Sequence, residues 1–204
     1  MPRLIVLHYT AMATCAQARD RLCDPVHQVS AHWLLDSDGQ AEQLVDEPRR
    51  AWHAGAGAWA GVRDVNSASI GIELQNPGHM PFPEPQMTAL ETLLAAMMAR
   101  WTIGPEGVIA HSDLAPTRKG DPGPHFDWRR LALQGLSVWP LPGRRAVAAD
   151  FAPHAHRFGY PQAPEPALLH AFRLRFRPWA HGPVDDVDAA LAADLAARFP
   201  AAPA

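Results

Sequence analysis

Residues 111–128 read HSDLAPTRKGDPGPHFDW, and this stretch restricts the fold more than any other part of the chain. It contains three prolines and two glycines. Proline removes a backbone donor and fixes φ, while glycine loosens the backbone, so we expect a shaped loop and neither a helix nor a central strand. The loop carries His111, Lys119 and Asp121. A stiffened loop that presents a histidine, a cation and a carboxylate is a candidate metal or catalytic site.

The composition is that of an ordinary globular protein. The chain has 204 residues, of which 48% are hydrophobic and 19% charged, enough for one full domain and a small second one. A net charge of −3 gives no indication of nucleic-acid binding, and no apolar run reaches the ~20 residues of a membrane span. The opening MPRLIVLHYTA is too short in apolar residues for a signal peptide. If Met1 is the native start, we expect a cytoplasmic protein; a trimmed start would instead allow a periplasmic one.

Apolar and polar patterning predicts strands in the first half of the chain. Residues 3–9 form a short apolar run typical of a buried strand, with His8 near its end. Residues 12–23 are predicted to be helical. Two short strands then follow, joined at Asp38–Gly39, a dipeptide typical of a hairpin turn.

A further strand is predicted around the sequence SIGIEL. Alternation places Ile70, Ile72 and Leu74 on one face and Gly71 and Glu73 on the other. Because Gly71 opens space beside it, we expect the carboxylate of Glu73 to point into a site.

The second half of the domain completes a mixed sheet. Residues 84–101 have the apolar spacing of a helix, residues 107–110 predict a strand that leads into His111, and a brief helix is expected around 126–133. The order of elements predicts an α/β (α+β mixed) fold, with a central mixed β-sheet flanked by helices.

The C-terminal part is predicted to be a small helical domain. Residues 135–165 are rich in Pro, Gly, Ala and Arg and are typical of a connector over the surface. Residues 166–204 contain two helical patterns, too few to form a large core, so we expect them to dock on the first domain, residues 1–134.

Residues from separate segments could form a zinc site. Catalytic zinc needs three protein ligands and an open position for water, which His8, His111 and Asp121 could supply. It also needs a base and a group for the developing oxyanion, for which Glu73 and Lys119 are candidates. Spacing alone supports this weakly, because no compact motif such as H-E-x-x-H is present.

A family resemblance supports the interpretation of these residues as a zinc site. The segments VLHYTA, VSAHWLLDSDGQ, RAWHAG, SIGIELQNPG and AHSDLAPTRKGDPGPHFDW closely resemble the zinc-dependent N-acetylmuramoyl-L-alanine amidases of the amidase-2 type, the AmpD/AmiD-like group. That group is related to phage lysozyme-type amidases and peptidoglycan recognition proteins. The likeness covers about residues 3–133. The tail around HAFRLRFRP resembles, more weakly, a three-helix peptidoglycan-binding-like module.

The resemblance implies a role for each candidate residue. His8, His111 and Asp121 correspond to the ligands of one Zn²⁺ ion, Glu73 to the catalytic glutamate and Lys119 to the catalytic lysine. The implied reaction is hydrolysis of the amide between the lactyl group of N-acetylmuramic acid and L-Ala, in muropeptides or peptidoglycan.

Ala31 marks a departure from the family pattern. Some relatives have a tyrosine before the histidine of the second strand, where this chain has Ala31 before His32. Any help from that hydroxyl is therefore missing, and Glu73 and Lys119 must suffice.

Other residues keep two interpretations. His53 could line the groove or make a structural hydrogen bond, and Arg118 could be a surface charge or a contact for muropeptide carboxylates. Trp52 could be a core anchor or a surface on which a sugar stacks, and we expect a core residue. His32 is expected to be structural or to support a ligand, and His125 to cap the loop, although it could approach substrate.

The function itself also has alternatives. Recycling of soluble anhydro-muropeptides in the cytosol is preferred over a periplasmic amidase of the polymeric wall. A binding module without catalysis is less favoured, because all five site positions are intact. We expect a monomer.

Overall fold

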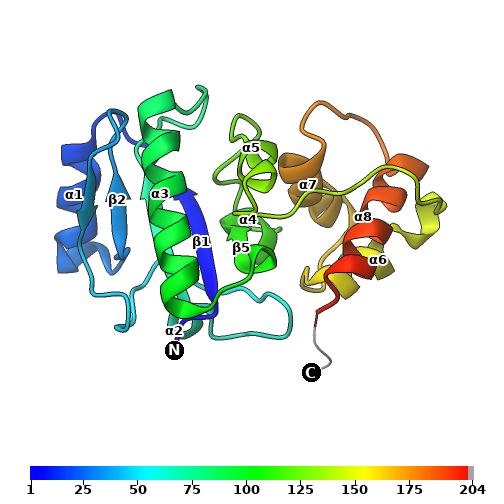
Figure 1. Cartoon of the computed structure of the whole chain (residues 1–204), viewed down its shortest axis with the longest axis horizontal. Coiled ribbons are helices and arrows are strands. Elements are labelled where there is room, and N and C mark those ends of the chain that lie inside the picture. The colour runs from blue at the N-terminus through cyan, green and yellow to red at the C-terminus, as the bar shows by residue number, and fades with distance from the viewer. Residues whose placement is uncertain (202–204) are drawn as a thin grey trace.

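The computed structural model describes residues 1–201, which form a five-stranded sheet with helices on both faces (Figure 1). The strands are β1 (Leu4–Tyr9), β2 (Trp33–Leu35), β3 (Ala41–Gln43), β4 (Ser69–Leu74) and β5 (Val108–Ala110). Their order is β3-β2-β4-β1-β5; β3 is antiparallel to β2 and the other pairs are parallel. The predicted mixed sheet and its hairpin are confirmed.

The helices account for most of the remaining regular structure. Those of the first half are α1 (Cys15–Cys23), α2 (Val65–Ala68), α3 (Glu84–Trp101), α4 (His111–Leu114) and α5 (Trp128–Leu133). The C-terminal helices are α6 (Phe151–Phe158), α7 (Glu165–Phe176) and α8 (Asp186–Arg198). Single turns of 3-10 helix occur at Pro25–His27, Pro105–Gly107 and Ala148–Asp150. Among the described residues, no helix is both long and apolar enough to cross a bilayer.

Helix α3 covers one face of the sheet. Its Leu90 and Leu94 are fully buried in one cluster with Ile70, Ile72 and Leu74 of β4. The predicted bounds of this helix and the predicted alternation along β4 are therefore confirmed. Alternation leaves Gly71 and Glu73 for the opposite face.

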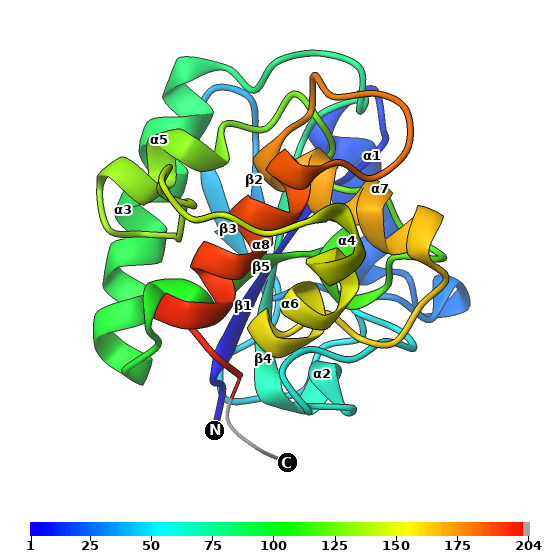
Figure 2. The same ribbon diagram turned by 90° about the vertical axis from the view of Figure 1, so that its right-hand side faces the viewer.

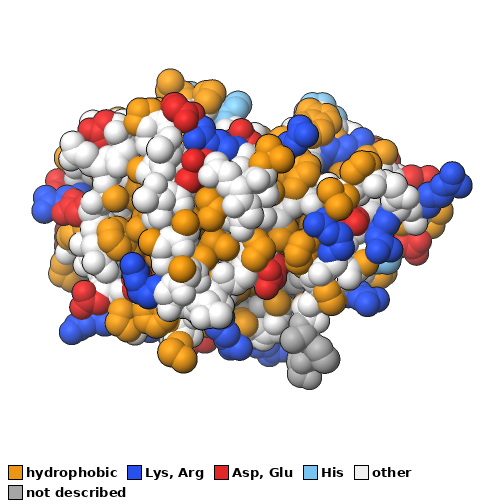
Figure 3. Space-filling view, in the orientation of Figure 1, with side chains coloured by type: hydrophobic (Ala, Val, Ile, Leu, Met, Phe, Trp, Pro, Cys, Tyr) orange, Lys and Arg blue, Asp and Glu red, His pale blue; other side chains and the backbone are white. Residues whose placement is uncertain are grey.

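The C-terminal helices pack on that opposite side, next to β5. Leu4 and Val6 of β1 share a buried cluster with Phe151, Leu168 and Phe172 of α6 and α7. Figure 2 shows α6, α7 and α8 grouped in front of β1 and β5. The expected docking of this unit is confirmed. In Figure 3, Lys and Arg side chains gather on the face over these helices.

Two stretches differ from the sequence predictions. The loop expected over 111–128 begins with helix α4, because its prolines start only at Pro116 and the side chain of Asp113 accepts from Ala110 N at 2.9 Å. The expected connector 135–165 contains helix α6, which packs against α8. Pro153 lies in the first turn of α6, where its missing N–H breaks no helical bond. Residues 202–204 of the predicted domain 166–204 lie outside the described residues. The three-part division stays a prediction.

Candidate metal centre

Parallel strands bring the first ligand candidate beside the candidate base. His8 lies opposite Glu73 in the register of β1 with β4. Both residues stand near the carboxyl ends of their strands, the edge at which parallel sheets commonly bind ligands. Since β1 is paired on both sides, by β4 and β5, the backbone of His8 is held firmly.

Strand β5 and the loop after it supply the other two ligand candidates. His111 begins α4 directly after β5, which pairs with β1. The loop then turns back, so that Ser112 N donates to the carbonyl of Asp121 at 3.0 Å. The turn places the Asp121 side chain beside His111.

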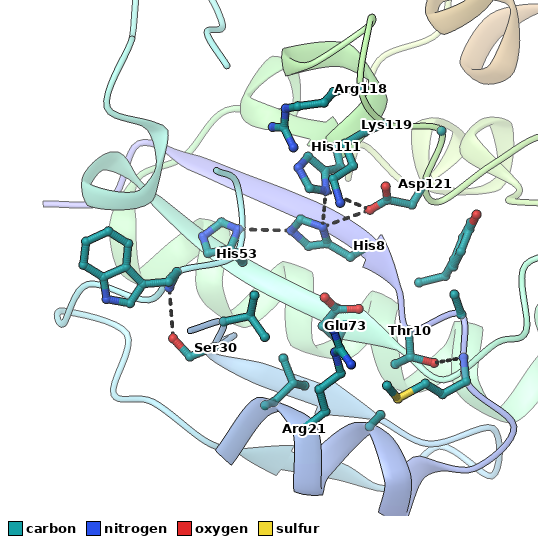
Figure 4. Close-up of a pocket in the computed structure, with 18 residues that line it drawn as sticks. His8, Thr10, Arg21, Ser30, His53, Glu73, His111, Arg118, Lys119 and Asp121 are labelled. Atoms are coloured by element: carbon teal, nitrogen blue, oxygen red, sulfur yellow. Dashed lines mark hydrogen bonds and ion pairs between the residues drawn. The ribbon is translucent and has the colours of Figure 1, made fainter. Parts of the chain in front are cut away.

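The side chains of His8, His111 and Asp121 meet in a triangle (Figure 4). The two Nδ1 atoms lie 2.9 Å apart, and each is 3.0 Å from Oδ2 of Asp121. All three residues are buried. Among residues 1–201 they are the one cluster of histidine, cysteine or acidic side chains arranged to share a metal ion.

The Nε2 atoms of His8 and His111, which point away from the triangle, each have a hydrogen-bond partner. Nε2 of His111 lies 3.0 Å from the carbonyl of Ala54, which can only accept, and Nε2 of His8 lies 3.0 Å from Nδ1 of His53. Burial, with the neighbouring His111, lowers the pKa of His8 to about 4, so its ring is neutral at neutral pH. Neutral imidazole is the form that binds metal.

The donor set fits zinc. Two imidazole nitrogens and a carboxylate oxygen form a common catalytic zinc set with one open position. Ligand atoms about 2.0–2.2 Å from a tetrahedral ion lie about 3.3 Å apart, so the triangle needs to open by only roughly 0.3 Å. Two nitrogen lone pairs and a carboxylate this close together repel one another, and a cation among them would offset that repulsion.

Glu73 and Lys119 line the same pocket, which has a volume of about 440 Å³. Figure 4 shows the Glu73 carboxylate facing this space below His8. Its Oε2 atom is buried and has no hydrogen-bond partner among the described residues. Burial, reinforced by the charge of Asp121, raises the pKa of Glu73 to about 8, while Lys119 opposes this shift. The structure thus brings all five residues from separate segments to one pocket.

Arg118 and His53, the two residues with open interpretations, both line the pocket, and a contact of either with substrate stays a prediction. Arg118 lines the pocket, yet its guanidinium also donates to the carbonyls of Ala54, at 2.9 Å, and of Ala56. His53 lines the pocket and bonds to His8. Ala54 accepts from both Arg118 and His111, so the loop before Gly55 links the pocket rim to a ligand candidate.

The structure also places the three remaining candidates, His32, Trp52 and His125. His32 is structural: its Nδ1 accepts from Gly71 N at 2.9 Å, and its Nε2 lies 3.0 Å from the carbonyl of Arg49. Trp52 is 57% exposed and lines the pocket, so the expectation that it is a core residue is wrong. His125 is exposed and is not among the residues that line the pocket.

Sequence reasoning missed two residues at the site. Ser69 lies beside His53 and shares the strand face of Gly71 and Glu73, so counting two residues back from Gly71 could have found it. Arg21 on α1 also lines the pocket, on the side away from Lys119 and Asp121 (Figure 4). Nothing in the local pattern of a helical arginine distinguishes it from a surface charge.

Comparison with known proteins shows the family of this chain. The profile of Amidase_2, described as N-acetylmuramoyl-L-alanine amidase, matches residues 1–124. N-acetylmuramoyl-L-alanine amidase AmiD of Escherichia coli (strain K12) is 36% identical over 97% of this chain and 83% of its own length. The structure of AmiD with the substrate anhydro-N-acetylmuramic acid-L-Ala-D-gamma-Glu-L-Lys superposes with a TM-score of 0.91 at 35% identity, covering 98% of this chain and 91% of that one.

Two further relatives match different shares of this chain. AmpDh3 from Pseudomonas aeruginosa, in complex with anhydromuramic pentapeptide, has a TM-score of 0.87 at 30% identity over 98% of this chain and 93% of its own. The 1,6-anhydro-N-acetylmuramyl-L-alanine amidase AmpD of Enterobacter cloacae is 39% identical, but over 50% of this chain and 55% of that protein. From the family match and the extended likeness to AmiD, the chain belongs to the Amidase_2 family of N-acetylmuramoyl-L-alanine amidases.

Proposed function

We propose that this protein is a zinc-dependent amidase that cleaves the bond between the lactyl group of N-acetylmuramic acid and L-Ala in anhydro-muropeptides. The observation that carries the proposal is the pocket in which a His-His-Asp triangle faces Glu73. Family membership and the substrate bound to AmiD support the choice of bond. Both AmiD and AmpDh3 hold an anhydromuramic ligand in their solved complexes, which favours soluble fragments.

The metal is proposed to be one zinc ion held by His8, His111 and Asp121. Zinc at this position would act as a Lewis acid that polarises the amide carbonyl and makes water more acidic. The three ligand atoms lie within 3.0 Å of one another in a buried triangle, an arrangement that suits a single ion.

Glu73 is proposed to move the proton. A carboxylate whose pKa lies near the operating pH can take a proton from the attacking water and return it to the departing amine of L-Ala. Its position opposite His8 in the sheet aims it at the pocket instead of at bulk solvent. No other side chain competes for Oε2 within the described part of the chain.

Lys119 is proposed to stabilise the oxyanion of the tetrahedral intermediate. Its ammonium group lines the pocket from the loop that also carries Asp121. A donor aimed at the developing negative charge commonly contributes ~3 kcal/mol. Arg118 and Arg21 add positive charge around the same pocket, which suits a peptide bearing free carboxylates.

Product analysis by mass spectrometry tests the proposal. Purified protein is offered soluble anhydro-muropeptides and intact sacculi side by side, with and without a chelator. We expect free stem peptide from the soluble fragments, abolished by chelation and restored by zinc. Release from sacculi at a comparable rate would indicate the alternative, an amidase of the polymeric wall. No release from either substrate, with zinc bound, would refute the amidase proposal. The cytoplasmic location and the monomeric state stay predictions.

Replacement of Glu73 by Gln should reduce activity without preventing metal binding. Loss of a general base commonly costs 10²–10⁴-fold in rate, so we expect a decrease of that size in kcat. Glu106→Gln, which changes an exposed glutamate at the far end of β5, is the matched control and should leave kcat unchanged. Activity of E73Q within a few-fold of the control would remove Glu73 from the mechanism.

A further inference from the structure

A chain of hydrogen bonds runs from the backbone of α2 to the ligand candidate His8. The hydroxyl of Ser69 lies 2.6 Å from the carbonyl of Val65 and 3.2 Å from Nε2 of His53. On the other side of its ring, Nδ1 of His53 lies 3.0 Å from Nε2 of His8. Ser69, His53 and His8 are all buried, which limits the access of bulk water to these bonds.

The direction of each bond follows from the first one. A carbonyl can only accept, so the single hydroxyl proton of Ser69 points to Val65. The oxygen of Ser69 must then accept from Nε2–H of His53. A neutral imidazole carries one proton, which leaves Nδ1 of His53 as an acceptor and makes Nε2 of His8 the donor. The remaining nitrogen of His8, Nδ1, keeps its lone pair and faces His111 and Asp121.

The fold makes room for this arrangement at one position. A β-carbon at Gly71 would lie 2.3 Å from Cγ of His53, so only glycine lets the ring approach β4 this closely. The backbone of Gly71 is itself fixed by His32, whose Nδ1 accepts from its N–H at 2.9 Å. His53 N and Ala54 N both donate to Oδ1 of Asn66, at 3.1 and 2.8 Å, which holds the loop that carries the ring.

We propose that His53, anchored by Ser69, is a positioning residue that sets the tautomer and orientation of His8, so that Nδ1 of His8 binds the metal. This inference rests on the metal site of the proposed function. It assigns His53 a role in metal binding in addition to its place in the pocket wall. Partners of this kind commonly contribute 10–100-fold to metal affinity.

Zinc affinity, measured by competition with a chromogenic chelator, tests the proposal without reference to hydrolysis. His53→Ala should weaken binding 10–100-fold, and Ser69→Ala, which keeps the ring but removes its anchor, by a smaller factor. His53→Asn places an amide oxygen near the position of Nδ1 and should recover most of the affinity. Ser67→Ala, an exposed serine two residues away, is the matched control.

A spectroscopic readout separates positioning from a general loss of stability. In the zinc-loaded wild-type protein, ¹⁵N chemical shifts of the histidine rings should show His53 protonated at Nε2 and His8 protonated at Nε2. The visible bands of the Co²⁺-loaded protein should shift in H53A and return in H53N. His53 protonated at Nδ1, or H53A with unchanged zinc affinity and Co²⁺ bands, would overturn the proposal. If affinity and tautomers are as expected but no substrate is cleaved, the proposed function fails and the positioning role stands.

Discussion

His8 and His111 present the same ring nitrogen to the site, but different parts of the fold hold them. His8 lies on a strand paired on both sides, so the sheet fixes its backbone and a bond to His53 fixes its ring. His111 lies on α4, a helix of four residues that is too short to be stable alone. Its ring is fixed by the carbonyl of Ala54.

Helix α4 is held by a buried network from the C-terminal helices. Arg175 of α7 forms an ion pair with Asp113 of α4 at 2.5 Å, and both side chains are fully buried. Arg175 also donates to the carbonyl of Val108, and the hydroxyl of Tyr160 donates to Asp113 at 2.6 Å. One ligand candidate therefore depends on its own sheet. The other depends on a helix whose Asp113 is bound by residues 47 and 62 positions further along the chain.

The largest effect is expected from removing the ion pair that supports α4 and therefore His111. Arg175→Met leaves the buried carboxylate of Asp113 without its cation, a change that commonly costs about 3–5 kcal/mol. We expect a decrease of that size in the free energy of unfolding, measured in urea, together with weaker zinc binding. Arg145→Met, at an exposed arginine, is the control. If R175M kept the stability of R145M, the C-terminal helices would not be supporting α4.

The support of His8 can be disturbed by a substitution at Gly71. In Gly71→Ala the new methyl group meets the ring of His53, and overpacking of this kind commonly costs about 1–3 kcal/mol. Urea unfolding measures the cost, and a chelator competition measures the accompanying loss of zinc affinity.

A double-mutant cycle shows whether the ring is the cause. Gly71→Ala should cost much less in a His53→Ala background, because the obstructing ring is gone. Equal costs in both backgrounds would place the strain elsewhere in β4 and leave His53 without a role at this position.

The buried Glu47 provides a smaller effect that is independent of both histidines. Burial raises its pKa, but hydrogen bonds from Arg100, Trp101 and Trp33 outweigh this and hold the pKa below its usual range. A depressed pKa contributes stability above the unfolded-state value of about 4.3, and this is lost as pH falls further.

Urea unfolding between pH 7 and pH 3 measures the Glu47 contribution. Stability of the wild type should fall more steeply below about pH 4.3 than that of Glu47→Gln. The zinc affinity at pH 7 should be the same in both proteins, because Glu47 lies outside the pocket lining. A large loss of affinity in E47Q would mean that the two faces of the sheet are coupled.

The sequence predicted the parts of the site that lie within regular patterns or family segments. Alternation along β4 correctly predicted that Glu73 faces away from the core that α3 covers. The apolar run before His111 correctly predicted a strand. The choice of ligand set came from the family resemblance, since His8 and Asp121 are more than a hundred positions apart and no local pattern joins them.

Other features could not be read from local patterns. Helix α6 was missed because Pro153 and a small-residue composition suggested a connector, although Phe151, Ala155 and Phe158 fall at helical spacing and are buried. The Asp113–Arg175 pair joins two separate helices, so only the folded chain shows it.

Anomalous diffraction at the zinc edge from crystals of the zinc-loaded protein tests the central claim most directly. We predict one peak per chain, about 2.0–2.2 Å from Nδ1 of His8, Nδ1 of His111 and a carboxylate oxygen of Asp121. A peak at another place, or zinc bound through Nε2 of His8, would contradict the account of how this site is built.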